Sequence, residues 1–278
     1  MAVFFESRKN KRKVNQDHYF YMEYRINHEA MIKVFLVADG MGGLSCGELA
    51  SSLAIEKWVL KLQKLTMSRD FLGQSITEQL EQLKMFSFGA VSKINEEVYQ
   101  ELTNQGIEGG TTLTTGILFF HNLILANCGD SPAYYYNEKD KCLMKISKDQ
   151  NVAEELVRQG KITKNSSTYM QKKHMLTDYI GKYKEAVPQV SSLTFSPGDI
   201  VLLGSDGAFG TLKEEEIRKI ILEKSERKEQ IVKEILNAAE GLGEEDNQTL
   251  LLYTEDKEVT KTEEPPKKKG WFRKRQAV

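Results

Sequence analysis

Five aspartates at the ends of apolar stretches are the residues of this 278-residue chain best suited to do chemistry. They are Asp17, Asp39, Asp130, Asp206 and Asp246. An isolated Asp-Gly pair is an ordinary turn signal, and glycine directly adjoins three of these acids. Neighbouring strand ends converge, however, and carboxylates that cluster there repel one another and lose hydration. We therefore expect the five acids to require a positively charged partner.

Divalent metal ions are the partner that this set of side chains favours. Hard cations such as Mg²⁺ and Mn²⁺ bind carboxylate oxygens. Zinc sites usually include cysteine or histidine, and neither accompanies these acids. The four histidines show no ligand spacing and are expected to be structural or surface residues: His18, His28, His121 and His174. The sequence thus predicts Mg²⁺ or Mn²⁺ rather than zinc.

Three further residues have both an ordinary and a functional interpretation. Ser131 and Ser205 adjoin two of the acids, but no His/Asp partner pattern accompanies them, so we expect turn or hydrogen-bonding roles rather than nucleophiles. Arg12 lies in the basic run RKNKRK, and such a run is usually a solvated face. A phosphate-binding role for Arg12 therefore depends on the neighbouring Asn15 and Asp17.

Strands and helices alternate in blocks along the chain. Segments rich in β-branched and aromatic residues predict strands at 18–24, 31–39, 111–120, 122–130, 131–137, 190–195, 199–206 and 248–254. Tight turns such as His121-Asn122 favour antiparallel sheets. Apolar residues recur with helical spacing at 47–65, 76–102, 151–160, 213–223 and 228–243. Together these patterns indicate an α+β domain with its sheets at the centre, ending near Tyr253.

Composition excludes several classes of protein. The 39 basic residues nearly balance the 40 acidic ones, so no nucleic-acid partner is expected. No run approaches the roughly eighteen apolar residues of a membrane span, and the amino terminus is the reverse of a secretory signal. The three cysteines are odd in number and lack paired spacing, which argues against a disulfide framework. We expect a cytoplasmic, bacterial-style protein.

The last residues, 255–278, differ in kind from the rest of the chain. They contain few aliphatic residues, a Pro-Pro and charge in blocks, which predicts a disordered basic tail. Within it, KKKGWFRKR (267–275) is either a solvated end or a peripheral anchor at the inner membrane surface, because lysine and arginine are attracted to anionic lipid. Liposome co-sedimentation with and without residues 265–278 distinguishes the two.

Six blocks of the sequence, in this order, resemble the signature blocks of a known enzyme family. They are RKVNQD (12–17), VADGMGG (37–43), EGGTTLTTGIL (108–118), ANCGDSPAY (126–134), LLGSDGAF (202–209) and EEDNQTLLL (244–252). The family is that of the metal-dependent serine/threonine protein phosphatases, PPM or type 2C, and DGMGG is similar to its bacterial branch. The resemblance covers residues 1–254. It implies a four-layer α-β-β-α sandwich in which helices flank two central antiparallel sheets.

The resemblance also implies a metal site with two ions. The Asp39 carboxylate would bridge both ions, and the backbone carbonyl of Gly40 would bind one of them. Asp206 and Asp246 would complete the shell of the first ion.

Three more positions match the family's pattern. Asp17 would hold metal-bound waters at the second ion, and Asp130 together with Asp206 matches a third, weaker metal site. Arg12 lies where the family has its phosphate-binding arginine.

The activity implied is hydrolysis of phosphoserine and phosphothreonine on proteins. Two divalent ions can activate a bridging water for in-line attack on phosphorus, and an arginine fork stabilises the charge that develops. Phosphorylated proteins and a cognate serine/threonine kinase, which the enzyme would oppose, are the expected partners. Two alternatives share the fold: a catalytically silent phosphoprotein-binding module, and a partner-switching regulator that acts on one small phosphoserine protein.

The chain departs from the family's pattern at a few positions. Met41 occupies the place of a histidine general acid in other branches, so the leaving oxygen must take its proton from another source. Pro132 follows GDS where arginine is usual, and KHMLTDYIG (173–181) replaces a more arginine-rich stretch. These changes concern the flap and the substrate groove, and they affect specificity more than catalysis.

Overall fold

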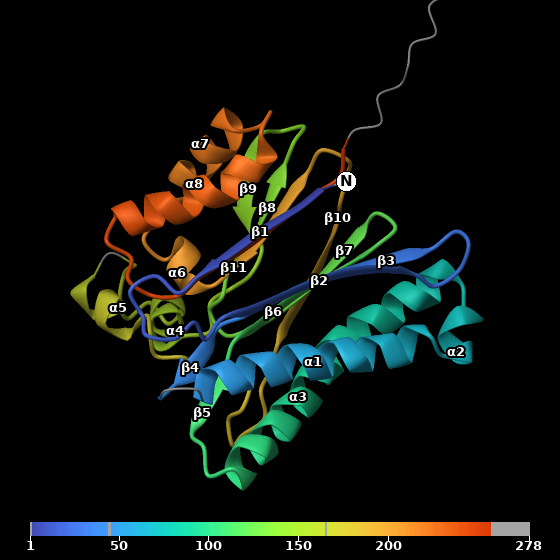
Figure 1. The fold of residues 1–278 in the computed structure, drawn as a ribbon, viewed down its shortest axis with the longest axis horizontal. Helices are drawn as coiled ribbons and strands as arrows, with labels where there is room; N and C mark the ends of the chain where they lie inside the picture. The colour runs from blue at the N-terminus through green and yellow to red at the C-terminus, as the bar shows by residue number, and fades with distance from the viewer. Residues whose placement is uncertain (1, 44–45, 165, 257–278) are drawn as a thin grey trace, which may run out of the picture.

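Two antiparallel sheets stacked face to face form the centre of the molecule (Figure 1). The computed structural model describes residues 2–43, 46–164 and 166–256. The first sheet has the order β1 (Ala2–Arg8), β12 (Gln248–Thr254), β11 (Ile200–Gly204), β8 (Ala133–Asn137) and β9 (Cys142–Lys145). The second has the order β10 (Gln189–Thr194), β7 (Asn122–Cys128), β6 (Leu113–Phe119), β3 (Met31–Ala38) and β2 (His18–Arg25).

Helices cover the outer face of each sheet (Figure 1). The long helices α1 (Cys46–Thr66) and α3 (Ile76–Asn104) pack on the second sheet, and α7 (Glu214–Glu223) and α8 (Lys228–Gly241) pack on the first. The short helices are α2 (Arg69–Leu72), α4 (Val152–Arg158), α5 (Ser167–Lys172) and α6 (Asp206–Phe209). The α+β assignment and the four-layer α-β-β-α sandwich are confirmed.

The side-chain alternation of β3 shows how the layers are held together. Phe35 and Val37 face the apolar core between the two sheets, whereas Val34 and Leu36 face the core beneath α1 and α3. Because successive residues of a strand point to opposite faces, one continuous apolar run can fill two cores. At the helix layer, Ser75 caps α3 through a capping box with Glu78, which fixes where that helix begins.

Several elements lie outside the sequence predictions. Strand β1 pairs with β12 along its whole length, although no strand was predicted at residues 2–8. A two-stranded ribbon of β4 (Gly40–Gly42) and β5 (Gly109–Thr111) extends from the second sheet towards α1. The predicted strand at 199–206 ends at Gly204, and Asp206 begins α6.

The topology gathers the strand ends that carry the five aspartates at one end of the sandwich. Asp39 follows β3, and Asp17 precedes β2, whose first residue pairs with the last residue of β3. In the other sheet, Asp206 follows β11 and Asp246 precedes β12, and these two strands are antiparallel neighbours. Antiparallel pairing therefore explains why acids far apart in the sequence meet.

The carboxyl-terminal end of the fold lies at the opposite end of β12 from Asp246. Glu255 forms an ion pair with Lys33 and accepts a hydrogen bond from the Tyr253 hydroxyl. The predicted tail beyond Asp256, including its basic and aromatic cluster, lies outside the described residues. None of the helices described in the structure is both long and apolar enough to span a membrane.

Candidate active site

A cavity of about 320 Å³ brings together most of the residues predicted for the site. Its lining includes six residues singled out in the sequence: Arg12, Asp39, Gly40, Asp130, Asp206 and Asp246. Asp17 does not line the cavity and is buried behind it, where its carboxylate raises the pKa of Asp39. The structure thus places all seven residues in one electrostatic cluster.

Two threonines of the β5–β6 segment hold the backbone of Asp39. The Asp39 N–H donates to the Thr112 hydroxyl at 2.9 Å, and the Thr112 N–H donates to the Asp39 carbonyl at 2.9 Å. The Thr111 hydroxyl donates to the same carbonyl at 2.9 Å. Because these bonds involve only the backbone of Asp39, its carboxylate is left for other partners. Both threonines occur in the EGGTTLTTGIL block, but nothing in the sequence predicted that they would hold Asp39.

Asn247 organises the other side of the cluster. Its N–H donates to Asp246 Oδ1 at 2.8 Å, and its side-chain oxygen accepts from the Gln16 N–H at 2.9 Å. Its amide nitrogen donates to the carbonyls of Lys9 and Val14 at 2.9 and 3.0 Å. One buried side chain therefore ties the loop that carries Arg12 to the start of β12. The sequence predicted a role for its neighbour Asp246 but none for Asn247.

Gly40 lies against the start of α1 with no room for a side chain. A Cβ atom on Gly40 would lie 2.2 Å from the carbonyl oxygen of Gly47 and 2.6 Å from that of Gln16. Gly47 is constrained in return, since its Cβ would lie 2.6 Å from the Gly40 carbonyl carbon. Two glycines thus allow β4 to cross directly over the first turn of α1, which fixes the backbone next to Asp39.

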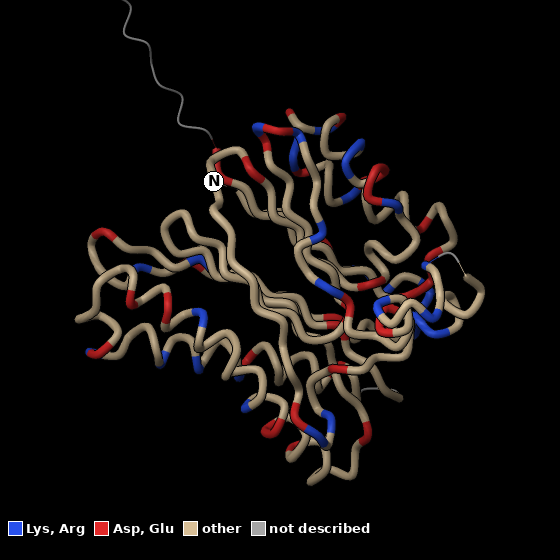
Figure 2. The backbone as a smooth tube through the Cα atoms, turned by 180° about the vertical axis from the view of Figure 1, so that it is seen from behind, with Lys and Arg blue, Asp and Glu red and all other residues tan. Residues whose placement is uncertain are grey.

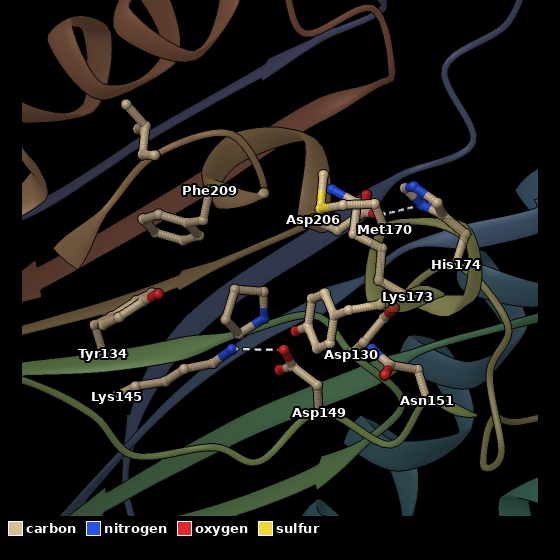
Figure 3. A pocket seen from close by; sticks show the side chains of 14 residues that line it. Asp130, Tyr134, Lys145, Asp149, Asn151, Met170, Lys173, His174, Asp206 and Phe209 are labelled. Carbon is tan, nitrogen blue, oxygen red and sulfur yellow. Dashed lines mark hydrogen bonds and ion pairs between the residues drawn. The ribbon is translucent and has the colours of Figure 1, made fainter. Parts of the chain in front are cut away.

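Arg12 and His174 approach the acids from two different loops. Arg12 Nη2 donates to Asp246 Oδ2 at 2.6 Å, a charge-assisted bond that raises the pKa of Arg12. His174 Nδ1 lies 4.0 Å from Asp206 Oδ2, and this pair is drawn in Figure 3. His174 is exposed, as expected for a surface residue, but it also lines the cavity. No spacing in the sequence indicated that His174 lines the cavity, because its position depends on how α5, which ends just before it, packs in the fold.

The two serines have the hydrogen-bonding roles expected of them. Ser131 Oγ lies 2.6 Å from the Thr112 hydroxyl, and Ser205 Oγ accepts from the Thr249 N–H at 2.9 Å. Both serines are fully buried. They support the backbone around the acids.

Burial and mutual repulsion raise the pKa values of the clustered carboxyl groups. Desolvation is the main cause at Asp17, whose pKa rises to about 7, and at Asp130, whose pKa rises to about 8. The pKa of Asp39 is raised well above its ordinary range, first by burial and then by the charges of the other acids. Burial and the charge of Asp246 raise the pKa of Asp206, whereas a side-chain hydrogen bond with Asp39 lowers it. The ionised cluster is therefore unstable without positive charge.

The donor set fits divalent cations that bind oxygen. Both Asp17 carboxylate oxygens are buried without a hydrogen-bond partner that meets normal geometry, although Ser205 and Thr249 lie near enough to lower its pKa slightly. Burying such a carboxylate without a partner is costly unless a cation binds it or a metal-bound water donates a hydrogen bond to it. Among the described residues, no three His, Cys, Asp or Glu side chains are arranged so as to hold an ion. Backbone carbonyls and water would have to contribute.

In EDTA, we expect the free energy of unfolding to fall as the pH rises from 6.5 to 8.5. The folded protein keeps protons on Asp17 and Asp130, with pKa values of about 7 and 8, that the unfolded chain has already released. The loss of stability that these two groups cause is absent below the ordinary pKa of aspartate. It is complete above their pKa values in the folded protein. The range starts at pH 6.5 because half-buried His18, whose pKa is lowered mainly by desolvation, changes the stability in the opposite direction below that pH.

Thermal unfolding of the wild type and of Asp17→Asn at several pH values checks this. The variant should show a shallower fall in Tm, since it lacks one of the two carboxyl groups. Saturating Mn²⁺ should reverse the slope, because metal ligands must be ionised. If the Tm of the wild type in EDTA rises over this pH range, the negative charge of the aspartate cluster is already balanced by other groups of the protein.

Comparison with known proteins gives the family. The family model described as protein phosphatase 2C matches residues 2–248. The chain belongs to the protein phosphatase 2C family. Its relatives include a serine/threonine phosphatase stp of Listeria monocytogenes, 28% identical over 258 residues that cover 92% of this chain and 96% of that protein.

Solved structures of this family share the fold. The serine/threonine phosphatase of S. agalactiae superposes with a TM-score of 0.76 at 22% identity, covering 91% of this chain and 99% of the other. The catalytic domain of the phosphatase PstP, in complex with two manganese ions, superposes with a TM-score of 0.70 at 23% identity, covering 90% and 96%. The predicted enzyme class is thus confirmed: this protein phosphatase 2C member is a metal-dependent protein serine/threonine phosphatase.

Proposed function

We propose that this protein phosphatase 2C member hydrolyses phosphoserine and phosphothreonine on proteins with two divalent ions held by the aspartate cluster. One observation carries the proposal: the carboxyl group of Asp39 lines one cavity together with three further acids and Arg12, and the charges of those acids raise its pKa. A phosphate group entering this cavity would meet bound cations and an arginine at once. The Mn²⁺ pair in the PstP complex is a property of that protein and supports the proposal by analogy.

Four residues of this cavity would be the ligands of Mg²⁺ or Mn²⁺. Asp39 would bridge the two ions, with the Gly40 carbonyl, Asp206 and Asp246 as further ligands. All four line the same cavity.

Outside that group, Asp17 would accept hydrogen bonds from water at the second ion. Its two oxygens have no other partner of normal geometry. Asp130 with Asp206 would provide a third, weaker site, and Asp206 raises the pKa of Asp130, as a shared site requires.

When bound, the ions would activate a water molecule for attack on phosphorus and neutralise the phosphate charge. Arg12 would orient the phosphate, since its bond to Asp246 uses Nη2 and a guanidinium has five N–H donors. Met41 lies in the cavity wall but has no proton to donate, so the leaving oxygen would be protonated by water.

Hydrolysis of p-nitrophenyl phosphate and of a phosphothreonine peptide tests the metal requirement. We expect turnover with Mn²⁺ or Mg²⁺, a loss of at least about 10²-fold in EDTA, and recovery when metal is restored. Activity that survives chelation would contradict the metal mechanism. Absence of activity with every metal, at normal Tm, would favour a phosphoprotein-binding module instead. Activity confined to one small phosphoserine protein would identify a partner-switching regulator.

The cellular setting is also part of the proposal. A cytoplasmic phosphatase of this kind would oppose a cognate serine/threonine kinase. The basic cluster at 267–275 would add peripheral contact with the inner membrane surface. Because the described chain leaves β12 at the end opposite the aspartates, such contact would leave the cavity open to protein substrates.

A further inference from the structure

Two segments of the chain are strongly basic and free of acids. Residues 7–16 contain five Lys or Arg and no Asp or Glu, and residues 156–177 contain another five and again no acid. The whole chain has a net charge of −1, so these segments depart sharply from the average. Their separation in the sequence is about 140 residues.

The fold brings one residue of each segment to the candidate active site. Arg12 from the first and His174 from the second line the same cavity of about 320 Å³. A neighbouring cavity of about 240 Å³ shares Asp130, His174 and Asp206 with it and also includes Lys173 (Figure 3). Figure 2 shows basic and acidic positions gathered at this end of the sandwich. We call the two basic segments the walls of the site and its aspartates the floor.

Six of the ten cations in the two segments have no ion-pair partner among the described residues. In the first segment Lys11 pairs with Glu245 and Arg12 with Asp246, whereas Lys9 and Lys13 form no ion pair in the described structure. Both of these lysines are exposed.

The second segment has the same character. Lys164 pairs with Glu154, while the other four cations form no ion pair within the described part of the chain: Arg158, Lys161, Lys172 and Lys173. Lys172 and Lys173 end α5, directly before His174. The exposed side chain of Met170 lies on the same short helix and lines the smaller cavity.

We propose that these walls select phosphorylated segments that carry acidic side chains on both sides of the phosphoresidue. A chain whose phosphate reaches the aspartates must pass both walls, because Arg12 lies at Asp246 and His174 lies at Asp206 in the lining of the same cavity. Carboxylates flanking the phosphoresidue would then meet Lys9 and Lys13 on one side and Lys172 and Lys173 on the other. This inference rests on the proposed phosphatase function and adds the class of substrate.

Phosphothreonine peptides that differ only in their flanks test the inference. We compare kcat/KM for alanine, glutamate and lysine flanks two and three residues away on both sides. Each exposed ion pair is worth about two- to five-fold, so the glutamate peptide should exceed the alanine peptide by roughly ten-fold at low ionic strength. Salt at about 0.5 M should reduce this ratio, because exposed charges are screened.

Two double variants locate the effect, and a third serves as the control. Lys172→Ala/Lys173→Ala and Lys9→Ala/Lys13→Ala should each lower the glutamate-to-alanine ratio by about three-fold or more. Lys219→Ala/Lys233→Ala removes the same charge from the outer helices α7 and α8 and should leave the ratio unchanged.

Three results would overturn the inference: equal kcat/KM for the glutamate and alanine peptides in the wild type, a ratio that neither wall variant changes, or an equal drop in the control. Hydrolysis of p-nitrophenyl phosphate by the wild type with Mn²⁺ is measured alongside. If it fails, the proposed function fails; if it succeeds while the peptides show no preference, only the substrate class is wrong.

Discussion

Asp39→Asn is expected to lower kcat/KM at saturating Mn²⁺ by about 10³-fold or more and, in EDTA, to raise Tm at pH 8. Both effects have one cause. The carboxyl group of Asp39 is held where burial and four neighbouring acids penalise its charge. Asparagine has almost the same shape and no charge, so it removes the repulsion together with the proposed metal ligand. The Thr111 and Thr112 bonds to the Asp39 backbone are retained, which keeps the fold unchanged.

Steady-state hydrolysis of p-nitrophenyl phosphate and thermal unfolding in EDTA measure the two effects. Asp140→Asn is the matched control, since Asp140 is an exposed acid in the turn between β8 and β9 and should change neither quantity. Activity within ten-fold of the wild type would exclude a bridging role for Asp39. A lower Tm in EDTA would mean that the Asp39 carboxylate stabilises the folded protein, against the direction of its pKa shift.

The strand-end acids could be predicted from the sequence because their positions follow from local rules. An apolar run that ends in Asp-Gly, as at Asp39 and Asp206, indicates a strand end, and antiparallel pairing brings such ends together. The order of blocks then supplied the sheet arrangement through the family resemblance. The burial of Asp17 and the raised pKa values at the cluster were outside that reasoning, since both depend on distances between strands.

Long-range contacts explain what the sequence did not reveal. The first strand, β1, pairs with the last, β12, so that Ala2 lies opposite Thr254, and no local pattern predicts a partner so far along the chain. Asn247 reaches back to Lys9 and Val14 in the same way. Short elements such as α6, with four residues, are also too brief for a helical period to be detected.

The glycines of DGMGG show the same limit most clearly. The sequence shows three glycines in this turn but does not indicate which of them must lack a side chain. The structure ranks them by available space. A Cβ on Gly40 would collide with backbone oxygens of Gly47 and Gln16, whereas a Cβ on Gly43 would have no atom of the described residues within 4 Å, its chain neighbours aside.

Gly40→Ala is therefore expected to abolish most activity, and Gly43→Ala to retain it. Contacts of 2.2 and 2.6 Å with rigid backbone cannot be relieved by a side-chain rotation, so β4 must move away from α1. Overpacking of this kind typically destabilises by about 1–3 kcal/mol. A shift of about 1 Å next to Asp39 is enough for a loss of about 10²-fold in kcat/KM.

Activity, Tm and Mn²⁺ affinity of the two variants separate the possible causes. If the Gly40 carbonyl is a metal ligand, Gly40→Ala should need more Mn²⁺ for half-maximal activity, while Gly43→Ala should match the wild type. A lower Tm with unchanged Mn²⁺ dependence would limit Gly40 to packing against Gly47. Similar losses in both variants would instead indicate that the whole turn must be free of side chains for substrate to enter.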